Sequence, residues 1–272
     1  MTYDLHSHTT ASDGSLSPEE LLNAATEAGV RTLAITDHDC VTGVKSVQQH
    51  KHDLTLIPGI EFSTSWSGVG IHVLGLNIAT DAESIEAGAA QQTRARIERA
   101  ATITKRLQSK GLVLDYDELI EQAGTDAPGR PHIAKYLLSK NLVKTEQDAF
   151  KKYLGAGKPG DVKNLWAELQ TVINWISDSG GTPVLAHPGK YKLTNAKLTR
   201  LCKEFQELGG QGIEVVSGKQ SDDLTRRLAR ITNELGMLSS CGSDFHQPGQ
   251  SWGRLGEAPA LPDSCTPVWD VW

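Results

Sequence analysis

Short apolar runs alternate with helical patterns over the first third of the chain, and the alternation returns near residue 165 and continues to about residue 241. Apolar runs of this length, rich in β-branched residues, predict strands. Seven such runs are Tyr3–Leu5, Thr32–Thr36, Leu54–Ser63, Gly70–Ile78, Thr182–Ala186, Gly212–Val216 and Met237–Cys241. Helical patterns follow most of them, which predicts parallel strands joined by crossover helices.

Helix start and stop signals bound the first of the predicted helices. Ser17 is an N-cap residue, Pro18 suits the first helical position, and Gly29 ends the helix. Further helices of this part of the chain are predicted at Val41–His50, Leu165–Ser179, Ala196–Leu208 and Asp222–Leu235.

The alternation stops between about residues 81 and 160, where strand signals are almost absent. This segment predicts one long helix and three shorter ones, at Glu83–Lys110, Tyr116–Ala123, Pro131–Lys140 and Glu146–Tyr153. The turn-rich stretch Gly155–Gly160 then returns the chain to the first pattern. We therefore expect an α/β domain made of residues 1–80 and 161–272, with a helical insertion at residues 81–160.

Composition narrows the class of protein. The 272 residues are 38% hydrophobic and 22% charged, as in an ordinary globular protein, and no apolar run approaches the roughly 18 residues of a membrane span. The first residues lack a signal-peptide pattern, and the four cysteines are scattered, so we expect a cytoplasmic protein without disulfides. A net charge of −6 argues against a surface that coats nucleic acid in general. No membrane contact and no protein partner are indicated.

Histidines and carboxylates gather at the ends of the predicted strands. A lone histidine is commonly a surface or core residue, and we assign His50 and His52 no role. The joint placement of nine residues is different: His6, His8, Asp13, His38, Glu61, His72, His187, Asp244 and His246. Residues two apart on a strand face one side, and active sites of parallel barrels lie at the carboxyl ends of strands. Nitrogen and oxygen ligands without thiolates suit Zn²⁺, Mn²⁺ or Fe²⁺, so we predict a polynuclear metal centre.

These nine residues resemble the motifs of the polymerase and histidinol phosphatase (PHP) superfamily. The matching motifs are Asp4-Leu5-His6-Ser7-His8-Thr9, Ser12-Asp13-Gly14, Ile35-Thr36-Asp37-His38-Asp39, Gly59-Ile60-Glu61, His72, His187 and Asp244-Phe245-His246. The resemblance implies a distorted seven-stranded (β/α) barrel and three divalent ions, with Mn²⁺ favoured and Zn²⁺ or Fe²⁺ as alternatives. The first ion would be held by His6, His8, Glu61 and Asp244. The second would share Glu61 and add His72 and His187. The third would be held by Asp13, His38 and His246.

The helical insertion, with its Gly129-Arg130-Pro131-His132 sequence, and the later Ser251-Trp252-Gly253-Arg254 sequence are similar to one bacterial branch of that superfamily. The branch includes nucleoside 3′,5′-bisphosphate phosphatases and ribonuclease AM, a 5′→3′ exoribonuclease that trims ribosomal RNA. It implies a phosphoesterase acting on 5′-phosphorylated nucleotides, nucleoside 3′,5′-bisphosphates or short RNA. Asp13, His38, Glu61, His187 and His246 would be its catalytic residues.

Substrate contacts are predicted outside this set. Arg130 can bind a second phosphate bidentately, with His132 and Lys190 as further candidates, although Arg130-Pro131 also fits a plain helix start. Trp66, Trp252, Trp269 and Trp272 can each stack a base or simply pack. Asp4, Asp37 and Asp39 are candidates for orienting imidazoles.

Two other functions stay open at this point. One is a small-metabolite phosphatase, such as one acting on histidinol phosphate. The long insertion disfavours it, because a small substrate needs less binding surface than the insertion supplies. The other is a non-catalytic metal-binding accessory module, which the complete set of nine ligand positions disfavours.

Overall fold

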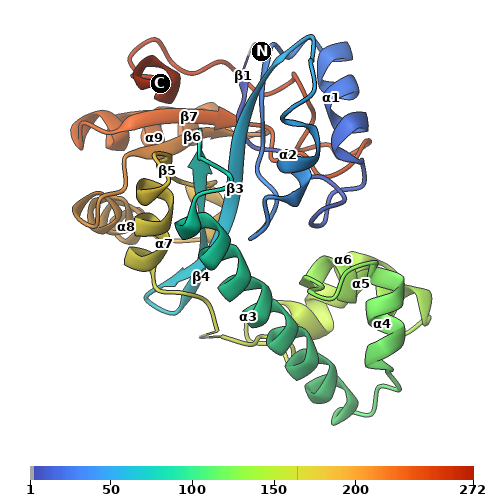
Figure 1. Cartoon of the computed structure of the whole chain (residues 1–272). Helices are drawn as coiled ribbons and strands as arrows, with labels where there is room; N and C mark the ends of the chain where they lie inside the picture. The colour runs from blue at the N-terminus through green and yellow to red at the C-terminus, as the bar shows by residue number, and fades with distance from the viewer. Residues whose placement is uncertain (1–2, 164) are drawn as a thin grey trace. The chain divides into compact units, whose positions relative to one another are not determined.

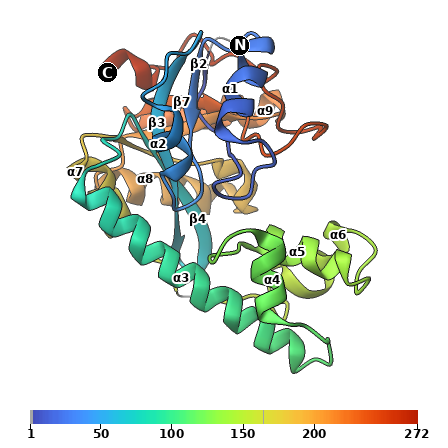
Figure 2. The ribbon, with the colours of Figure 1, turned by 45° about the vertical axis from the view of Figure 1, so that its right-hand side comes forward.

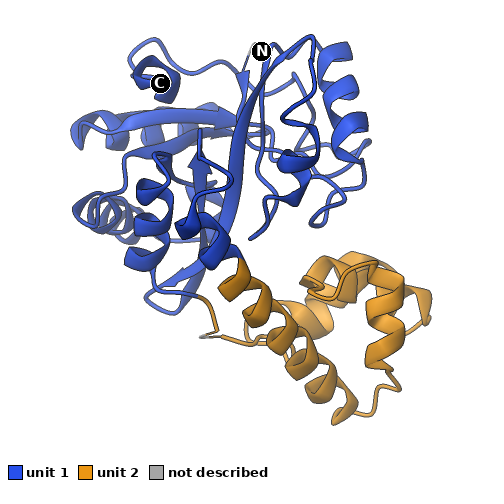
Figure 3. Cartoon of the chain, in the orientation of Figure 1, with its two compact units in different colours: residues 1–89, 167–272 blue, residues 90–166 orange. Residues whose placement is uncertain are grey.

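A computed structural model describes residues 3–163 and 165–272. The chain forms two compact units (Figure 3): residues 1–89 with 167–272, and residues 90–166. The first unit contains all the strands described below, and the second is helical. No helix in the described part of the chain has both the length and the apolar character needed to cross a membrane.

The first unit is built on a seven-stranded sheet in which sequence order and spatial order coincide (Figure 1). The strands are β1 (Tyr3–Asp4), β2 (Thr32–Ile35), β3 (Thr55–Trp66), β4 (Val69–Leu76), β5 (Thr182–Leu185), β6 (Gly212–Ser217) and β7 (Leu238–Gly242). All seven predicted strands are present. The sheet is nearly closed into a barrel, because Leu5 N donates to Cys241 O at 3.0 Å and His8 N donates to Phe245 O at 2.9 Å.

The expectation of parallel strands throughout was wrong for β4, which runs antiparallel to both β3 and β5. Ser67 and Gly68 form the connection from β3, with φ angles of 48° and 74°. Positive φ at both central residues is the requirement of a two-residue hairpin turn, and such a turn is too short for a crossover. As a result, the amino-terminal half of β4 lies at the same rim as the carboxyl ends of the other strands.

Five α-helices of this unit pack outside the sheet (Figure 1): α1 (Pro18–Glu27), α2 (Thr42–Val47), α7 (Leu169–Asp178), α8 (Asn195–Glu207) and α9 (Asp222–Glu234). The start of α1 is a capping box in which Ser17 N donates to Glu20 Oε2 at 2.8 Å and Glu20 N donates to Ser17 Oγ at 3.3 Å. The helix buries Leu21, Leu22 and Ala25 in the outer core between helices and sheet.

Neighbouring residues on a strand alternate between two cores, as a pleated sheet requires. On β2, Leu33 and Ile35 belong to the outer core, whereas Ala34 belongs to a smaller cluster inside the barrel with Leu74 and Val184. Val268 also joins the inner cluster, from the short helix η3 (Val268–Val271). The sequence did not predict this helix, which covers the barrel end away from the histidines.

The second unit is a helical subdomain with its own core. The long helix α3 (Glu83–Gln108, Figure 2) starts in the first unit, where Ile85 is fully buried, and continues into the second. The shorter elements are α4 (Tyr116–Ala123), α5 (Arg130–Ser139), α6 (Glu146–Ala149) and the π-helix η1 (Phe150–Leu154). Tyr136 lies in the core and its hydroxyl donates to Glu118 Oε2 at 3.1 Å. The role of this unit as a substrate-binding cap stays a prediction.

Candidate metal centre

All nine predicted ligands belong to the first unit, and the structure brings them together at one rim of the barrel. They form four overlapping groups, in each of which the potential ligand atoms lie within 4.8 Å of one another: His8, Asp13, His38 and His246; His6, His187 and Asp244; His6, His8 and Glu61; and His38, Glu61 and His72. The groups include every member of the predicted set. Clusters of this composition can hold metal ions.

The rim is formed by strand ends from both ends of the sequence. Residues just beyond β1 and β7 are joined by a parallel bridge between Ser7 and Phe245, so the ligands flanking them lie side by side. A second bridge, between His38 and Glu61, joins the segment after β2 to the middle of β3. His72 reaches the same rim because β4 is antiparallel, with Ser63 of β3 opposite it.

Glu61 is the centre of the arrangement. Its Oε1 lies 2.9 Å from His187 Nε2 and 3.0 Å from His72 Nδ1. Its Oε2 lies 2.9 Å from His38 Nδ1 and 3.3 Å from His8 Nε2. Burial raises the pKa of Glu61, but the imidazoles around it lower that pKa more, to well below the usual range. The carboxylate is therefore ionised, and both of its oxygens face imidazoles that can ligate a metal ion.

Asp13 forms a second centre on the loop that follows β1. Its Oδ1 lies 3.5 Å from His246 Nε2, and its Oδ2 lies 3.8 Å from His38 Nε2. The His8 and His246 rings stack nearby, with centroids 4.1 Å apart. One carboxylate facing three imidazoles is a donor set that could hold a metal ion.

Two of the imidazoles are held neutral. Burial, and after it the His246 imidazole, lower the pKa of His8 to about 3. Burial likewise lowers the pKa of His72 to about 4, against the opposing effect of Glu61. A neutral imidazole keeps a lone pair for a metal ion, so the environment favours ligation at these two residues.

His6 behaves differently, because three carboxylates surround it. Burial lowers its pKa, but Glu214, Glu61 and Asp244 raise it more, to well above the usual value. A proton on His6 thus balances buried negative charge in the metal-free protein. A divalent cation among the same carboxylates would replace that proton, so metal binding and proton release are coupled.

Buried polar atoms at the rim fit a cation. His8 Nδ1 and His187 Nδ1 are buried and form no hydrogen bond within the described part of the chain, and His6 Nε2, His8 Nε2 and Glu61 Oε2 have ion-pair contacts but likewise form no hydrogen bond there. Leaving such atoms without a partner costs about 1–3 kcal/mol each. Imidazole nitrogens and carboxylate oxygens are ligands for borderline divalent ions, so the donor chemistry agrees with a metal centre.

Backbone strain is concentrated at the same rim. Asp39, His187 and Asp244 have positive φ angles of 53°, 28° and 54°, which residues with a Cβ seldom adopt. Backbone hydrogen bonds hold two of them in place: Asp39 N donates to Glu61 O and Asp244 N donates to His6 O, both at 2.9 Å. Strain of about 1–3 kcal/mol per residue persists where the surroundings enforce it, commonly at functional sites.

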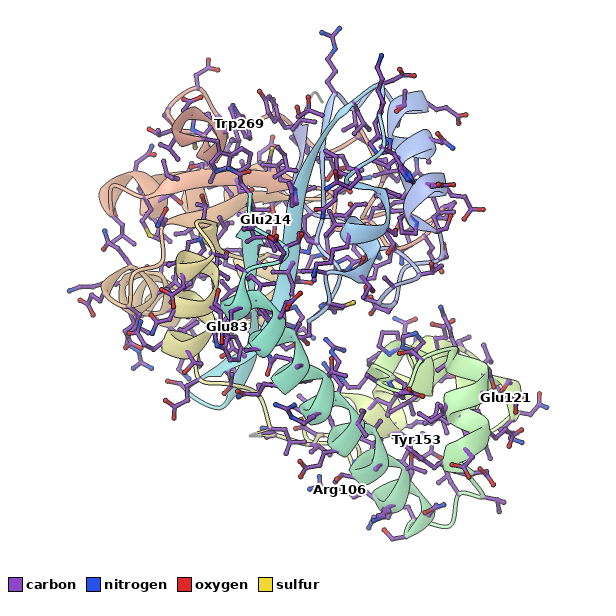
Figure 4. All side chains as sticks on the ribbon, viewed as in Figure 1. Glu83, Arg106, Glu121, Tyr153, Glu214 and Trp269 are labelled. Carbon is purple, nitrogen blue, oxygen red and sulfur yellow. The ribbon has the colours of Figure 1, made fainter. Side chains whose placement is uncertain are left out.

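Glu214 of β6 is a site residue that the sequence analysis missed. It is fully buried inside the barrel (Figure 4), where its Oε1 lies 3.1 Å from His6 Nδ1 and its Oε2 accepts a hydrogen bond from His187 N at 2.5 Å. It therefore orients one predicted ligand by its ring and another by its backbone. The available signal was a single carboxylate within the apolar run Gly212–Val216.

We expect Glu214→Gln to weaken metal binding by about 10- to 100-fold, the usual effect of removing a group that orients a ligand. An amide in either orientation places its NH₂ group against the His6 ring N–H or the His187 N–H, so one hydrogen bond is lost. Calorimetric titration with Mn²⁺ measures the effect, with the exposed Glu207→Gln as the matched control. Equal affinities in the two variants would contradict the role of Glu214.

The three aspartates expected to orient imidazoles have other partners. Asp37 accepts hydrogen bonds from Thr9 N and Thr9 Oγ1 at 2.8 and 2.7 Å, and from Ser12 Oγ at 2.7 Å. It thus fixes the loop that carries His8 and Asp13. Asp39 accepts from Ser63 N at 2.7 Å, and Asp4 accepts from Ser243 N at 2.7 Å. These groups position backbone segments.

The predicted substrate residues lie in both units. Lys190, on the 3-10 helix η2 (Pro188–Tyr191), forms an ion pair with Asp244 at the rim. Arg130 begins α5, with Pro131 in its first turn, and its Nη1 donates to Leu154 O at 3.3 Å. Gly129 N donates to His132 Nδ1 at 3.1 Å, so His132 caps the same helix. Arg130 and His132 therefore have structural roles, and their contact with substrate stays a prediction.

Comparisons with known proteins agree with this geometry. The family model described as PHP domain matches residues 4–215. A 3′,5′-nucleoside bisphosphate phosphatase of Chromobacterium violaceum is 36% identical over 98% of this chain and 94% of its own length. The 5′-3′ exoribonuclease Rnm of Escherichia coli is 41% identical over 99% of this chain and 93% of its own length. One similar solved structure is described as an amidohydrolase from Chromobacterium violaceum with bound sulfate and no metal. It is 35% identical in sequence and has a TM-score of 0.90. The match covers 100% of this chain and 95% of that chain.

Proposed function

The chain belongs to the PHP domain family, and we propose that it is a metal-dependent phosphoesterase acting on 5′-phosphorylated nucleotides or RNA. It removes the 3′-phosphate of nucleoside 3′,5′-bisphosphates, releases nucleotides from RNA 5′ ends, or does both. The observation that carries the proposal is the gathering of nine histidine and carboxylate side chains at one rim. Relatives named for these two activities align over nearly the whole chain, which supports the same substrate class.

We assign three divalent ions to the rim, with Mn²⁺ as the favoured metal. Glu61, at the centre of five imidazoles, suits the bridging position between the first two ions. His187 Nε2 lies 3.3 Å from His72 Nδ1, close enough for the two rings to share the second ion. Asp13, with His38 and His246, suits the third.

The ions would activate water and stabilise the charge that develops on the transferred phosphoryl group. The histidine and carboxylate groups would hold the ions at the rim, and burial keeps His8 and His72 neutral and so able to ligate them. Asp13, His38, Glu61, His187 and His246 are the proposed catalytic residues, and each belongs to at least one of the ligand groups. His246 is 19% exposed at its side chain, which leaves it accessible to a substrate.

One site can serve both proposed activities, because the two substrates share a geometry. The 3′-phosphate of a nucleoside bisphosphate occupies the place of the first phosphodiester in an RNA with a 5′-phosphate. A pocket that binds the 5′-phosphate would therefore select the 5′ end of RNA and the bisphosphate alike. The acidic net charge of −6 does not oppose such substrates, since some of the carboxylates face the cation sites.

The helical unit offers an anion-binding set for that 5′-phosphate. The guanidinium carbons of Arg96 and Arg99 lie 5.4 and 5.0 Å from the Trp166 ring centroid. Burial lowers the pKa of the neighbouring Arg130, Asp161 opposes this, and Arg96 lowers it further. Three arginines held close together in partly buried positions suit a phosphate group. His132 is a further proposed substrate contact within the helical unit. Lys190 is a separate proposed substrate contact at the metal rim of the first unit.

We expect Arg130→Ala to raise KM for 5′-phosphorylated substrates by about 10- to 100-fold. The reason is that the substrate would lose one or two charge-assisted hydrogen bonds to the guanidinium. KM for a phosphate monoester without a second phosphate should change much less. Steady-state kinetics on both substrates measure the difference, with the exposed Arg94→Ala as the control. Equal effects on the two substrates would remove Arg130 from the specificity role.

Product analysis tests the proposed function directly. Purified protein with Mn²⁺ is incubated with adenosine 3′,5′-bisphosphate and with a short RNA bearing a 5′-phosphate. Release of inorganic phosphate from the first, or of mononucleotides from the 5′ end of the second, supports the proposal. Hydrolysis of neither substrate rejects it, and faster hydrolysis of histidinol phosphate would favour a small-metabolite phosphatase instead.

A further inference from the structure

The structure separates the four tryptophans that were equal candidates for stacking on a base. Trp66 is buried and its ring N–H donates to Glu204. Trp269 stacks on Tyr3 with ring centroids 3.8 Å apart, and Trp272 Nε1 donates to Thr182 Oγ1 at 3.1 Å, both at the barrel end away from the histidines. Trp252 alone of the four lies at the metal rim, with its ring centroid 6.0 Å from that of His246.

Trp252 presents a large apolar ring to solvent beside the proposed ligands. Its exposure is 40%, among the highest of the large hydrophobic residues described. An indole that is partly exposed beside the proposed ligands offers an aromatic face for contact with a ligand.

The backbone under this ring is firmly held. Lys219 N donates to Trp252 O at 2.7 Å. A Cβ on Gly218 would lie 2.2 Å from that same carbonyl oxygen, and a Cβ on Gly253 would lie 2.9 Å from Ser243 O. The two glycines therefore let the segment pack directly on the ends of β6 and β7. An exposed ring on a fixed backbone is a preorganised contact surface.

Cationic side chains lie beside the ring, of which Arg254 is paired with Glu257. Lys190 Nζ lies 4.5 Å from the ring centroid and also pairs with Asp244. Trp252 further lines a hollow of about 270 Å³, together with Lys219, Arg254 and five other residues. That volume exceeds a single nucleobase. The combination of an aromatic face with flanking cations is the arrangement by which proteins bind single-stranded nucleic acid.

We propose that Trp252 stacks on a nucleobase next to the reacting phosphate, with Lys190 neutralising the adjoining phosphate. This inference rests on the proposed function and names the part of the substrate that the rim recognises. Stacking accepts any base, because every base has a π face, so Trp252 supplies affinity without sequence preference. The site thereby distinguishes nucleotides from small phosphate esters that lack a ring.

The test compares Trp252→Ala, Trp252→Phe and the control Trp272→Ala, whose parent residue is 37% exposed at the opposite end of the barrel. Each protein is assayed with adenosine 3′,5′-bisphosphate and with 1,2-dideoxyribose 3,5-bisphosphate, an abasic analogue. Binding of adenosine 5′-monophosphate is measured separately by calorimetry. Trp252→Ala should raise KM and Kd for the nucleotides by about 5- to 100-fold and leave the abasic substrate unchanged. Trp252→Phe should restore most of the loss, and Trp272→Ala should match the wild type.

Two results would overturn the inference: equal losses on the nucleotide and the abasic substrate, or no loss on either. The proposed function can fail separately. The wild type could hydrolyse no substrate and still bind adenosine 5′-monophosphate in a manner that depends on Trp252. That result would support base stacking and reject the proposed phosphoesterase activity. Normal hydrolysis of the bisphosphate by all variants would support the proposed activity and reject base stacking by Trp252.

Discussion

Replacing Glu61 with alanine should abolish turnover, with kcat/KM falling by at least about 10⁴-fold, as when a central catalytic group is removed. The reason is the number of imidazoles that converge on one carboxylate, which would leave two cations without their bridging ligand. The metal content should fall together with activity. Phosphate release and elemental analysis of the same preparation measure both quantities.

The matched control is Glu86→Ala, which removes a carboxylate that is 58% exposed at its side chain and paired with Lys45. This variant should retain wild-type activity and metal content. Circular dichroism of both variants separates loss of the site from loss of the fold. Retention of more than a tenth of wild-type turnover by Glu61→Ala would contradict the central role of this residue.

Replacing Asp13 with alanine should lower kcat by about 10³-fold, since a catalytic cation contributes several kcal/mol to the barrier. Asp13 is the one carboxylate of the group that also contains His38 and His246. Its loss should release a single ion and leave the ions around Glu61 bound. The residue lies on a loop outside the apolar cores, so the melting temperature should change little.

The exposed Asp81→Ala is the control for this second variant, and it should be indistinguishable from the wild type. Counting ions per chain by elemental analysis distinguishes the two carboxylate positions. A loss of all metal from Asp13→Ala would mean that the rim binds its ions as one cooperative unit. An unchanged ion count with normal kcat would show that Asp13 is no ligand.

Local patterns predicted the strands and helices well, because the apolar periodicity of each element, and for some helices a capping side chain, lies within its own segment. The capping box of Ser17 and Glu20 is an example that can be read from four consecutive residues. The direction of β4 could not be predicted from such local patterns, because the alternation of strands and helices along the chain favoured parallel pairing. The predicted strands left residues 64–69 between them, and only the observed bounds of β3 and β4 reduce the connection to the two-residue turn at Ser67 and Gly68.

The predicted ligands gather at one rim because strand ends meet there, whatever the details of the side chains. The features of the site that the sequence did not predict depend on contacts between segments that are distant in the sequence. Glu214 touches His6 and His187 from another strand, and no spacing rule connects these three residues. The roles of the tryptophans were equally hidden, since only the fold places Trp252 and Trp272 at opposite ends of the barrel.

The hydrogen bonds that close the barrel have a consequence for synthesis of the protein. His8 N pairs with Phe245 O, so ligands from the start of the chain meet those from its end only when β7 is in place. Contacts between such distant residues make folding slow, because a long loop must close first. A nascent chain therefore exposes its first two histidines on the ribosome without a complete centre. We expect fragments that end before β7 to hydrolyse no phosphate ester, because Asp244 and His246 follow that strand.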